Sequence, residues 1–289
     1  MKRRIAVFFI ARSAALSFCG FAVAARKPNI VLIIADDLGY RELGCFGQKK
    51  IRTPNLDALA QHGMRLTQHY SGNAVCAPSR CVLMTGRHPG HAYIRSNKGT
   101  PPEGQWPIPD EEVTIAELLQ KQGYVTGAFG KWGLGGPESA GRPCNQGVDR
   151  FFGYTPHFTP RAAYAAMITR MDRYIGNVLR QLDELNLADN TIVVFSSDNG
   201  TTHLGEEVDY EFINSVGELR GLKGSLYEGG VRVPTIVRWP SHVPAGEAHN
   251  YVSGFEDWMP TLLDLIGAKK DIPANIDGIS IAMPLLGEK

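Results

Sequence analysis

The sequence has little net charge and few cysteines. Its 289 residues contain 30 lysines and arginines against 29 aspartates and glutamates, which leaves a net charge of +1. Nucleic-acid binding needs a basic surface that this composition does not supply, so no nucleic-acid partner is predicted. The 5 cysteines form no C-x-x-C pair, which argues against a zinc site and a dense disulfide framework. A single disulfide among Cys45, Cys81 and Cys144 stays open.

A long apolar run is also missing beyond the N-terminus. Met1–Arg4 carry three positive charges, an apolar stretch interrupted by Arg12 follows, and Ala22-Val23-Ala24 has the small-x-small pattern of a cleavage site. Residues 1–25 are therefore predicted to be a cleaved signal peptide of an exported protein, periplasmic or secreted, with no membrane span. The remaining residues, 26–289, have the length and apolar content of one domain.

Strand and helix patterns alternate along this domain. The β-branched runs at 28–35 and 191–197 are typical of strands buried on both faces of a parallel sheet. A helix from about Arg161 carries apolar residues at spacings of three and four as far as Leu185. Shorter helices are expected at 53–62, 76–84, 113–122 and 255–266, and shorter strands at 124–129 and 235–238. This alternation predicts an α/β fold with a mostly parallel central sheet and helices on both faces.

Acidic and amide side chains follow the two long strands. Asp36 and Asp37 come after the first strand, and Asp198 and Asn199 come after the second. Ligands of parallel sheets bind outside the carboxyl ends of the strands, so these side chains predict one site. Their oxygen atoms suit Ca²⁺ or Mg²⁺ and do not suit zinc. Strand-end aspartates also cap helices and start turns, so the pattern alone leaves a structural role open.

Basic residues and one cysteine lie in neighbouring loops. Arg80, Lys131 and Lys223 fall in turns or glycine-rich segments, and together they would suit a tetrahedral oxyanion such as sulfate or phosphate. Cys76 stands four residues before Arg80, at the start of the helix expected at 76–84. A thiol in that position can act as a nucleophile. The residues alone therefore indicate a metal-assisted group transfer with Cys76 as nucleophile.

Ordered motifs resemble one known family. Cys76-Ala77-Pro78-Ser79-Arg80, followed by Leu83-Met84-Thr85-Gly86-Arg87, is similar to the signature of the type I sulfatases, which have the alkaline-phosphatase-like fold. Six further blocks, spread over nearly all of residues 27–286, resemble the same family: PNIVLIIADDLGY, TPNLDALAQHGMRLTQHY, GYVTGAFGKWGLGGP, NQGVDRFFGY, TIVVFSSDNG and RGLKGSLYEGGVRVP.

The resemblance implies a covalent mechanism. Cys76 would be oxidised to formylglycine by a formylglycine-generating or sulfatase-maturing enzyme, and Arg80 would hold the modified side chain. Lys131 and Lys223 would grip the sulfate. One hydroxyl of the aldehyde hydrate would attack sulfur and leave a sulfate ester on residue 76, which the second hydroxyl would then expel. One Ca²⁺ would be bound by residue 76 and four further side chains: Asp36, Asp37, Asp198 and Asn199.

Three departures from the family pattern stand out. Gly133 replaces a histidine that many members carry (GKWGLG for GKWHLG), and His203 is the candidate substitute. Near 154–157 a long segment is missing that in relatives supplies a strand, pocket loops and a leaving-group histidine, a role for which His157 is the weaker candidate. The chain stops after DGISIAMPLLGEK, so the C-terminal subdomain is expected to be largely absent.

The leading prediction is a hydrolase of sulfate esters that acts on a sulfated small molecule or saccharide. Similarity of the blocks leans towards arylsulfatase-like and N-acetylgalactosamine-6-sulfatase-like members. The alternative is a catalytically impaired sulfatase-like protein that binds calcium or a sulfated ligand without turnover. A phosphatase or phosphodiesterase is disfavoured, because C-x-P-S-R recruits formylglycine formation and a second, histidine-rich metal site is missing.

Overall fold

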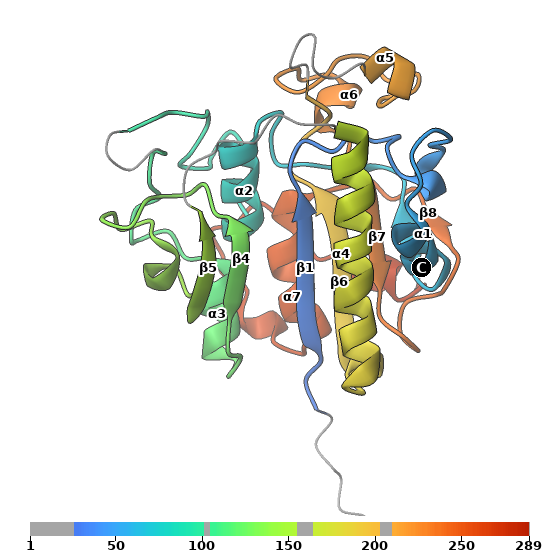
Figure 1. Ribbon diagram of the computed structural model, residues 1–289. Coiled ribbons are helices and arrows are strands. Elements are labelled where there is room, and N and C mark those ends of the chain that lie inside the picture. Colours follow the sequence, from blue (N-terminus) through green and yellow to red (C-terminus); the bar gives the residue numbers. More distant parts are fainter. Residues whose placement is uncertain (1–25, 101–104, 155–163, 203–209, 289) are drawn as a thin grey trace, which may run out of the picture.

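A mixed β-sheet lies at the centre of the molecule (Figure 1). The structure is a computed structural model that describes residues 26–100, 105–154, 164–202 and 210–288. The predicted signal peptide and two candidate residues, His157 and His203, lie outside these ranges. Among the residues described, no helix has the length and apolar character needed to cross a membrane.

The central sheet has five strands in the order β1-β6-β7-β2-β8. Their bounds are Asn29–Ala35 (β1), Thr191–Ser197 (β6), Thr235–Arg238 (β7), Met64–Leu66 (β2) and Ala248–His249 (β8). β1 is parallel to β6, and β2 is parallel to β8, whereas β7 is antiparallel to both of its neighbours. Four strands therefore share one direction, and β7 alone opposes them.

Two smaller sheets complete the strands that the structure describes. β4 (Gly127–Lys131) pairs in parallel with β5 (Arg150–Tyr154), and β3 (His69–Tyr70) pairs in parallel with β9 (Ser253–Gly254). β4 begins three residues later than the strand expected at 124–129, because its pairing with β5 starts at Gly127 opposite Arg150. The pattern of apolar residues located this strand but not its register.

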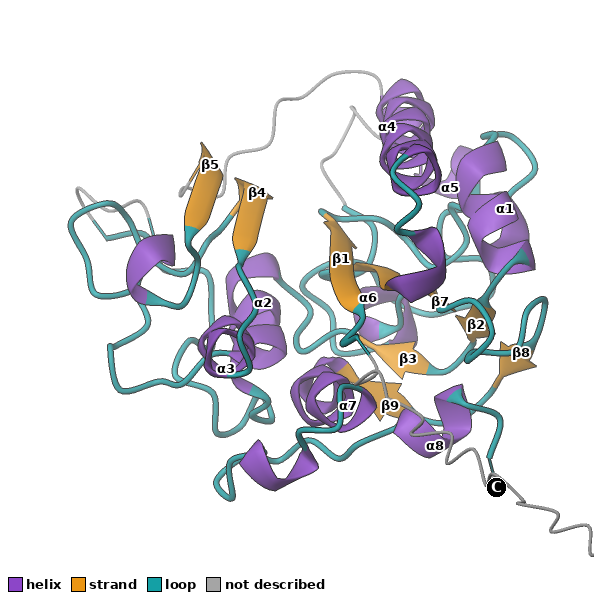
Figure 2. Ribbon diagram, turned by 90° about the horizontal axis from the view of Figure 1, so that it is seen from below, coloured by secondary structure: helices purple, strands orange, loops and turns teal. Residues whose placement is uncertain are grey.

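Helices cover both faces of the central sheet, as Figures 1 and 2 show. α1 (Pro54–Gln61) and α4 (Tyr164–Glu184) lie on one face, and α2 (Cys76–Thr85), α3 (Ile115–Lys121) and α7 (Trp258–Leu265) lie on the other. Val193 and Phe195 of β6 join the core formed with α1 and α4, whereas Ile192 and Val194 join the core formed with α2, α3 and α7. This alternation follows from the two-residue period of a strand, and the predicted α/β fold is confirmed.

Short elements connect these layers. One-turn helices are α5 (Tyr210–Ile213), α6 (Glu228–Val231) and α8 (Ala282–Leu285), and 3-10 turns occupy Gly44–Phe46, Pro143–Asn145, Ala188–Asn190, Phe255–Asp257 and Lys269–Asp271. The four cysteines in the described ranges are all free thiols, so the disulfide left open by the sequence does not form.

Candidate active site

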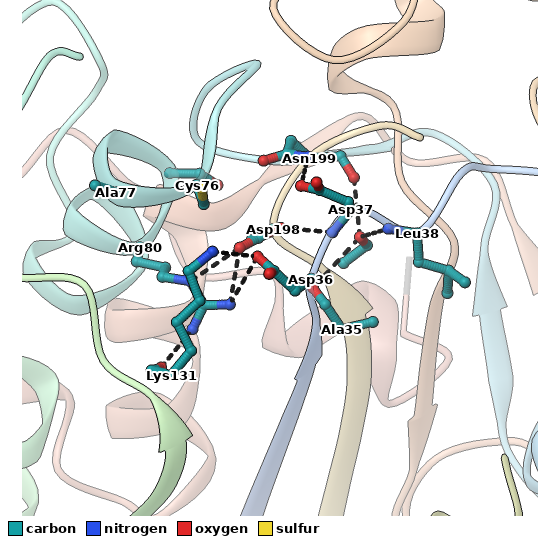
Figure 3. Close-up of polar contacts among 12 residues, drawn as sticks. Ala35, Asp36, Asp37, Leu38, Cys76, Ala77, Arg80, Lys131, Asp198 and Asn199 are labelled. Carbon is teal, nitrogen blue, oxygen red and sulfur yellow. Dashed lines mark hydrogen bonds and ion pairs between the residues drawn. The ribbon is translucent and has the colours of Figure 1, made fainter. Parts of the chain in front are cut away.

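The carboxyl ends of β1 and β6 bring the two acidic pairs together. The strands pair in register as far as Ala35 opposite Ser197, so the residues that follow them emerge side by side (Figure 3). The backbone N–H of Asp37 donates to Oδ1 of Asp198 at 3.2 Å, and the N–H of Asp198 donates to the carbonyl of Ala35 at 3.0 Å. Two strands far apart in sequence thus form one acidic edge, as the pattern predicted.

The turn after β1 is held in an unusual backbone conformation. Asp37 has φ of +62°, in the left-handed region that aspartate tolerates better than most residues. The Ser197 hydroxyl accepts a hydrogen bond from the N–H of Leu38 at 2.9 Å and donates to the carbonyl of Asn199 at 2.9 Å. This hydroxyl therefore joins the two strand ends and fixes the direction of the carboxylates.

α2 presents Cys76 and Arg80 on one face, one helical turn apart. Cys76 is the first residue of the helix and is 1% exposed. The guanidinium of Arg80 contacts Oδ2 of Asp198 through Nη2 at 2.8 Å and through Nε at 2.9 Å, and its Nη1 donates to the carbonyl of Lys131 at 2.7 Å. Arg80 therefore connects the helix, the acidic edge and the end of β4.

The two lysines contact the aspartates that follow β1. Lys131, the last residue of β4, places Nζ 2.6 Å from Oδ1 of Asp36. Lys223 forms an ion pair with Oδ1 of Asp37 and has its Nζ 3.9 Å from the Cys76 sulfur. Burial favours the neutral amine of each lysine, but the neighbouring carboxylate outweighs burial and raises both pKa values. Both lysines therefore remain charged at neutral pH.

The buried carboxylates titrate differently. Burial raises the pKa of Asp198 to about 7, an effect that Arg80 opposes and the charge of Asp36 reinforces. Burial also raises the pKa of Asp36, but the positive charges of Lys131 and Arg80 outweigh it and lower that pKa to about 2. A cation beside this pair would favour the ionised form of both carboxyl groups.

Several oxygen and sulfur atoms converge on a position suitable for a cation. Single ligand atoms of Asp36, Cys76 and Asp198 lie within 4.8 Å of one another. Oδ2 of Asp36 and Oδ1 of Asn199 are buried and lack a hydrogen-bond partner in the described structure. Such buried oxygens are rare in proteins unless water or an ion satisfies them. The donor set is mostly oxygen and suits Ca²⁺ or Mg²⁺.

One contact of Cys76 gave no signal in the sequence. The side-chain amide of Asn97 donates to the Cys76 sulfur at 3.5 Å, and its carbonyl accepts from the N–H of Ala77 at 3.1 Å.

Gly133 also lies beside the site. A Cβ added there would stand 3.7 Å from Cδ of Arg80, and the φ of +77° at this position favours glycine. A side chain at 133 would therefore face Arg80, on a backbone that disfavours one.

The structure brings together eight of the nine candidate site residues: Asp36, Asp37, Cys76, Arg80, Lys131, Asp198, Asn199 and Lys223. The ninth, His203, and the weaker candidate His157 lie outside the described residues. The carboxylates of Asp36, Asp37 and Asp198 therefore lie beside the positive charges of Arg80, Lys131 and Lys223, around the buried thiol of Cys76. A divalent cation bound here would pair with the carboxylates, and an anionic substrate would pair with the positive side chains.

Comparison with known proteins gives a consistent result. The Sulfatase family model matches residues 28–160 and 155–268. Human arylsulfatase A is 31% identical over 368 aligned positions, which cover 96% of this chain and 71% of the relative. Human N-acetylgalactosamine-6-sulfatase is 29% identical over 356 positions, covering 92% and 67%.

Solved structures share the fold. The crystal structure of Ps i-CgsB in complex with k-i-k-neocarrahexaose superimposes with a TM-score of 0.79 and 27% identity, covering 91% of this chain and 77% of the other. PsFucS1 sulfatase from Pseudoalteromonas sp. has a TM-score of 0.75 at 24% identity, covering 91% and 72%.

Proposed function

This chain belongs to the sulfatase family and is a sulfuric ester hydrolase, and from that premise we propose that it acts through a formylglycine made from Cys76 beside one calcium ion. The observation that carries the proposal is the meeting of Cys76, three carboxylates and three cationic side chains at one sheet edge. Each of these residues has a place in the reaction.

Calcium would be held by Asp36, Asp37, Asp198, Asn199 and the side chain at 76. When bound, it would act as a Lewis acid that polarises the attacking hydroxyl and the sulfate oxygen. Two observations support the fit: the unpartnered buried oxygens of Asp36 and Asn199, and a donor set dominated by oxygen.

The lysines would exchange partners as the site fills. Lys131 and Lys223 contact carboxylate oxygens that a cation would also use. A cation bound to Asp36 and Asp37 would weaken these ion pairs, and the two ammonium groups would then be available to a sulfate oxygen. Positive charges placed around the reacting group stabilise the negative charge that develops in the transition state.

The position of residue 76 suits an attacking group. At the start of α2 the helix dipole favours negative charge, and the Lys223 ammonium lies beside the sulfur. One hydroxyl of the hydrated aldehyde would lose its proton and form a bond to the sulfur of the sulfate group, while the bond from that sulfur to the substrate oxygen breaks and the alcohol leaves with a proton. The second hydroxyl would then lose its proton, the C–O bond to the sulfate would break, and the aldehyde would form again.

The modification must precede folding. Cys76 is 1% exposed and lies against Asn97 and Lys223, so an enzyme cannot reach its sulfur in the folded chain. A formylglycine-generating or sulfatase-maturing enzyme would therefore act on the unfolded chain. Export through a signal peptide at residues 1–25 fits this order for a route that carries unfolded chains across the membrane.

The substrate class is a sulfated small molecule or saccharide. Proteins similar to this chain include arylsulfatase A and N-acetylgalactosamine-6-sulfatase, and one structure with the same fold holds D-Glucosamine-2-N, 6-O-disulfate. The test is hydrolysis of a chromogenic aryl sulfate with calcium, by protein whose residue 76 is identified by peptide mass. Turnover should disappear in Cys76→Ala and persist in Cys144→Ala, which removes an exposed thiol remote from the site.

The alternative function is binding of calcium or a sulfated ligand without turnover. The Sulfatase family model matches in two separate parts, residues 28–160 and 155–268, which join within 155–160, and this observation favours the alternative. Formylglycine-containing protein that binds calcium but does not hydrolyse aryl or saccharide sulfates would support the alternative and contradict the proposed hydrolysis.

A further inference from the structure

An open slot separates β1 from β4. Both strands point their carboxyl ends the same way, and no strand lies between them in Figures 1 and 2. A cavity of about 780 Å³ lies between the two strands, and it is lined by Ile30–Ile34 of β1 and Gly127–Lys131 of β4. Within the described chain, β1 pairs only with β6, and β4 pairs only with β5. Two unpaired backbone edges therefore face one cavity, which we call the β1–β4 slot.

The composition of β1 is typical of an interior strand, which has a neighbouring strand on each edge. Its sequence, NIVLIIA, matches β6 in character, yet six of its seven residues are only half-buried, whereas all seven of β6 are buried. Natural edge strands are protected by charges, prolines or bulges. Residues 30–34 of β1 have no charge and no proline. The strand therefore lacks the protection expected of a permanent edge.

Apolar side chains surround the slot. Leu83 and Met84 of α2 and Leu119 of α3 line one side, and Val178 of α4 lines the opposite side. Phe129 of β4 is 78% exposed, and its partner Phe152 in β5 is 80% exposed. Large apolar groups at these exposures form a patch of the kind that marks interaction sites.

The size of the slot fits a single strand. A strand occupies roughly 160 Å³ per residue, from its rise of about 3.3 Å, its spacing of about 4.8 Å and a layer of about 10 Å. The cavity volume therefore corresponds to about five residues, which is the length of β4. Contacts hold the slot at both ends: Lys131 pairs with Asp36 at the top, and the Tyr124 hydroxyl donates to the carbonyl of Pro28 at 2.8 Å at the bottom.

The comparisons show that a relative has sequence that this chain lacks. The alignment with human arylsulfatase A spans 368 positions, so at least 79 of them have no residue of this 289-residue chain opposite. The two parts of the family match meet at residues 155–160, directly after β5. The two matches therefore join just after the strand that pairs with β4, on the side of β4 away from the slot.

We propose that the β1–β4 slot binds one extended apolar segment of a partner polypeptide, which adds a strand between β1 and β4. Backbone hydrogen bonds to both edges would supply much of the affinity, as in other cases of strand addition. Side chains on one face of the segment would pack on α2 and α3, and those on the other face would lie beside Val178 and Phe129. The occupant must therefore be β-branched or aromatic on both faces and free of proline.

The test uses a labelled peptide of five alternating valine and phenylalanine residues with lysines at both ends. Its control has proline at the central position, which removes a backbone donor. Anisotropy should show saturable binding with a Kd below about 100 µM, at least about tenfold tighter than for the control. Hydrogen exchange should slow in β1 and β4 and stay unchanged in β6, which is already paired on both sides.

A matched pair of variants locates the site. Val178→Lys places a charge at the slot and should weaken peptide binding at least about fivefold, whereas Tyr174→Lys, on the same helix but outside the slot, should not. Both side chains are partly exposed, at 43% and 48%, so neither change removes core packing. Neither residue belongs to the candidate active site, and the readout requires no sulfatase activity.

Three results would overturn the proposal. Equal binding of the proline control would show that strand pairing is not involved. Protection confined to regions other than β1 and β4 would place the peptide elsewhere. Protein that is already a dimer, with β1 amides protected before peptide is added, would show that a second copy of this chain covers the edge.

Discussion

The guanidinium of Arg80 contacts the fully buried carboxylate of Asp198 through two nitrogen atoms, Nη2 at 2.8 Å and Nε at 2.9 Å. This pair attaches α2 to the end of β6 and thereby fixes Cys76 relative to the acidic edge. Its removal affects stability as well as chemistry, because the remaining charge would be buried without a partner.

Arg80→Ala should therefore lower the free energy of unfolding by about 3–5 kcal/mol. The double variant Arg80→Ala/Asp198→Asn should recover part of this loss, because the unpaired buried charge is gone. Urea unfolding of the two single variants and the double variant measures this coupling. If Arg80→Ala had the same free energy of unfolding as the chain without substitutions, the structural role of the pair would be contradicted.

Calcium should stabilise the folded protein. At a concentration 100 times its Kd, a ligand that binds only the folded state stabilises it by about 2.7 kcal/mol. Asn199→Ala removes a buried, unpartnered oxygen and should reduce the calcium-dependent rise in Tm, whereas Asn145→Ala, remote from the site, should keep it. Titration of calcium after chelation, followed by the melting temperature, gives the comparison. An unchanged Tm in the presence of calcium would exclude the proposed metal site.

The lysines are predicted to serve substrate binding. Lys223→Gln and Lys131→Gln each remove one charge that would contact sulfate, so each should raise KM and lower kcat/KM by about tenfold or more. Lys121→Gln, at the end of α3, removes a charge that has no contact with the site and is the control. Steady-state kinetics separates the two effects. Unchanged kinetics in both site variants would show that sulfate is bound elsewhere.

His69 should make stability depend on pH. Its ring is fully buried, and Nε2 accepts a hydrogen bond from the Trp258 N–H at 3.0 Å, so the proton is on Nδ1, 2.7 Å from the Ser253 hydroxyl. Burial lowers its pKa to about 3. The unfolded chain therefore takes up a proton first as the pH falls below about 6.5, and stability is lost between there and about 3.

At pH 5 this loss should amount to about 2 kcal/mol relative to pH 8. His69→Gln cannot take up that proton, so its unfolding free energy should change correspondingly less between the two pH values. Urea unfolding at both pH values provides the test. The same pH dependence in the variant would assign the loss to other groups.

Much of the site followed from the sequence because it depends on local patterns. The β-branched runs ending in Asp36-Asp37 and Asp198-Asn199 predicted parallel neighbours, and the segment from Cys76 to Arg80 predicted a thiol at the start of a helix, near an arginine. The contact of Asn97 with Cys76 was missed, because it joins a loop to a helix and no periodic pattern marks it.

The environment of β1 could not be predicted either. Its composition indicates a strand with neighbours on both edges, and only the structure shows that one edge faces a cavity. The sequence of a strand indicates which of its side chains can be buried, whereas the pairing of its edges depends on the other strands present in the fold. For this reason the structure shows the β1–β4 slot, whereas the residue pattern of β1 does not predict it.

The proposed mechanism is tested most directly by measuring aryl sulfate turnover against the fraction of chains that carry formylglycine at residue 76. Preparations made with different amounts of a maturing enzyme would provide the range, and peptide mass would give the fraction in each. Turnover per molecule should rise in proportion to the modified fraction and vanish when Cys76 is fully unmodified. Turnover by fully unmodified protein, or none by fully modified protein with calcium, would contradict the account.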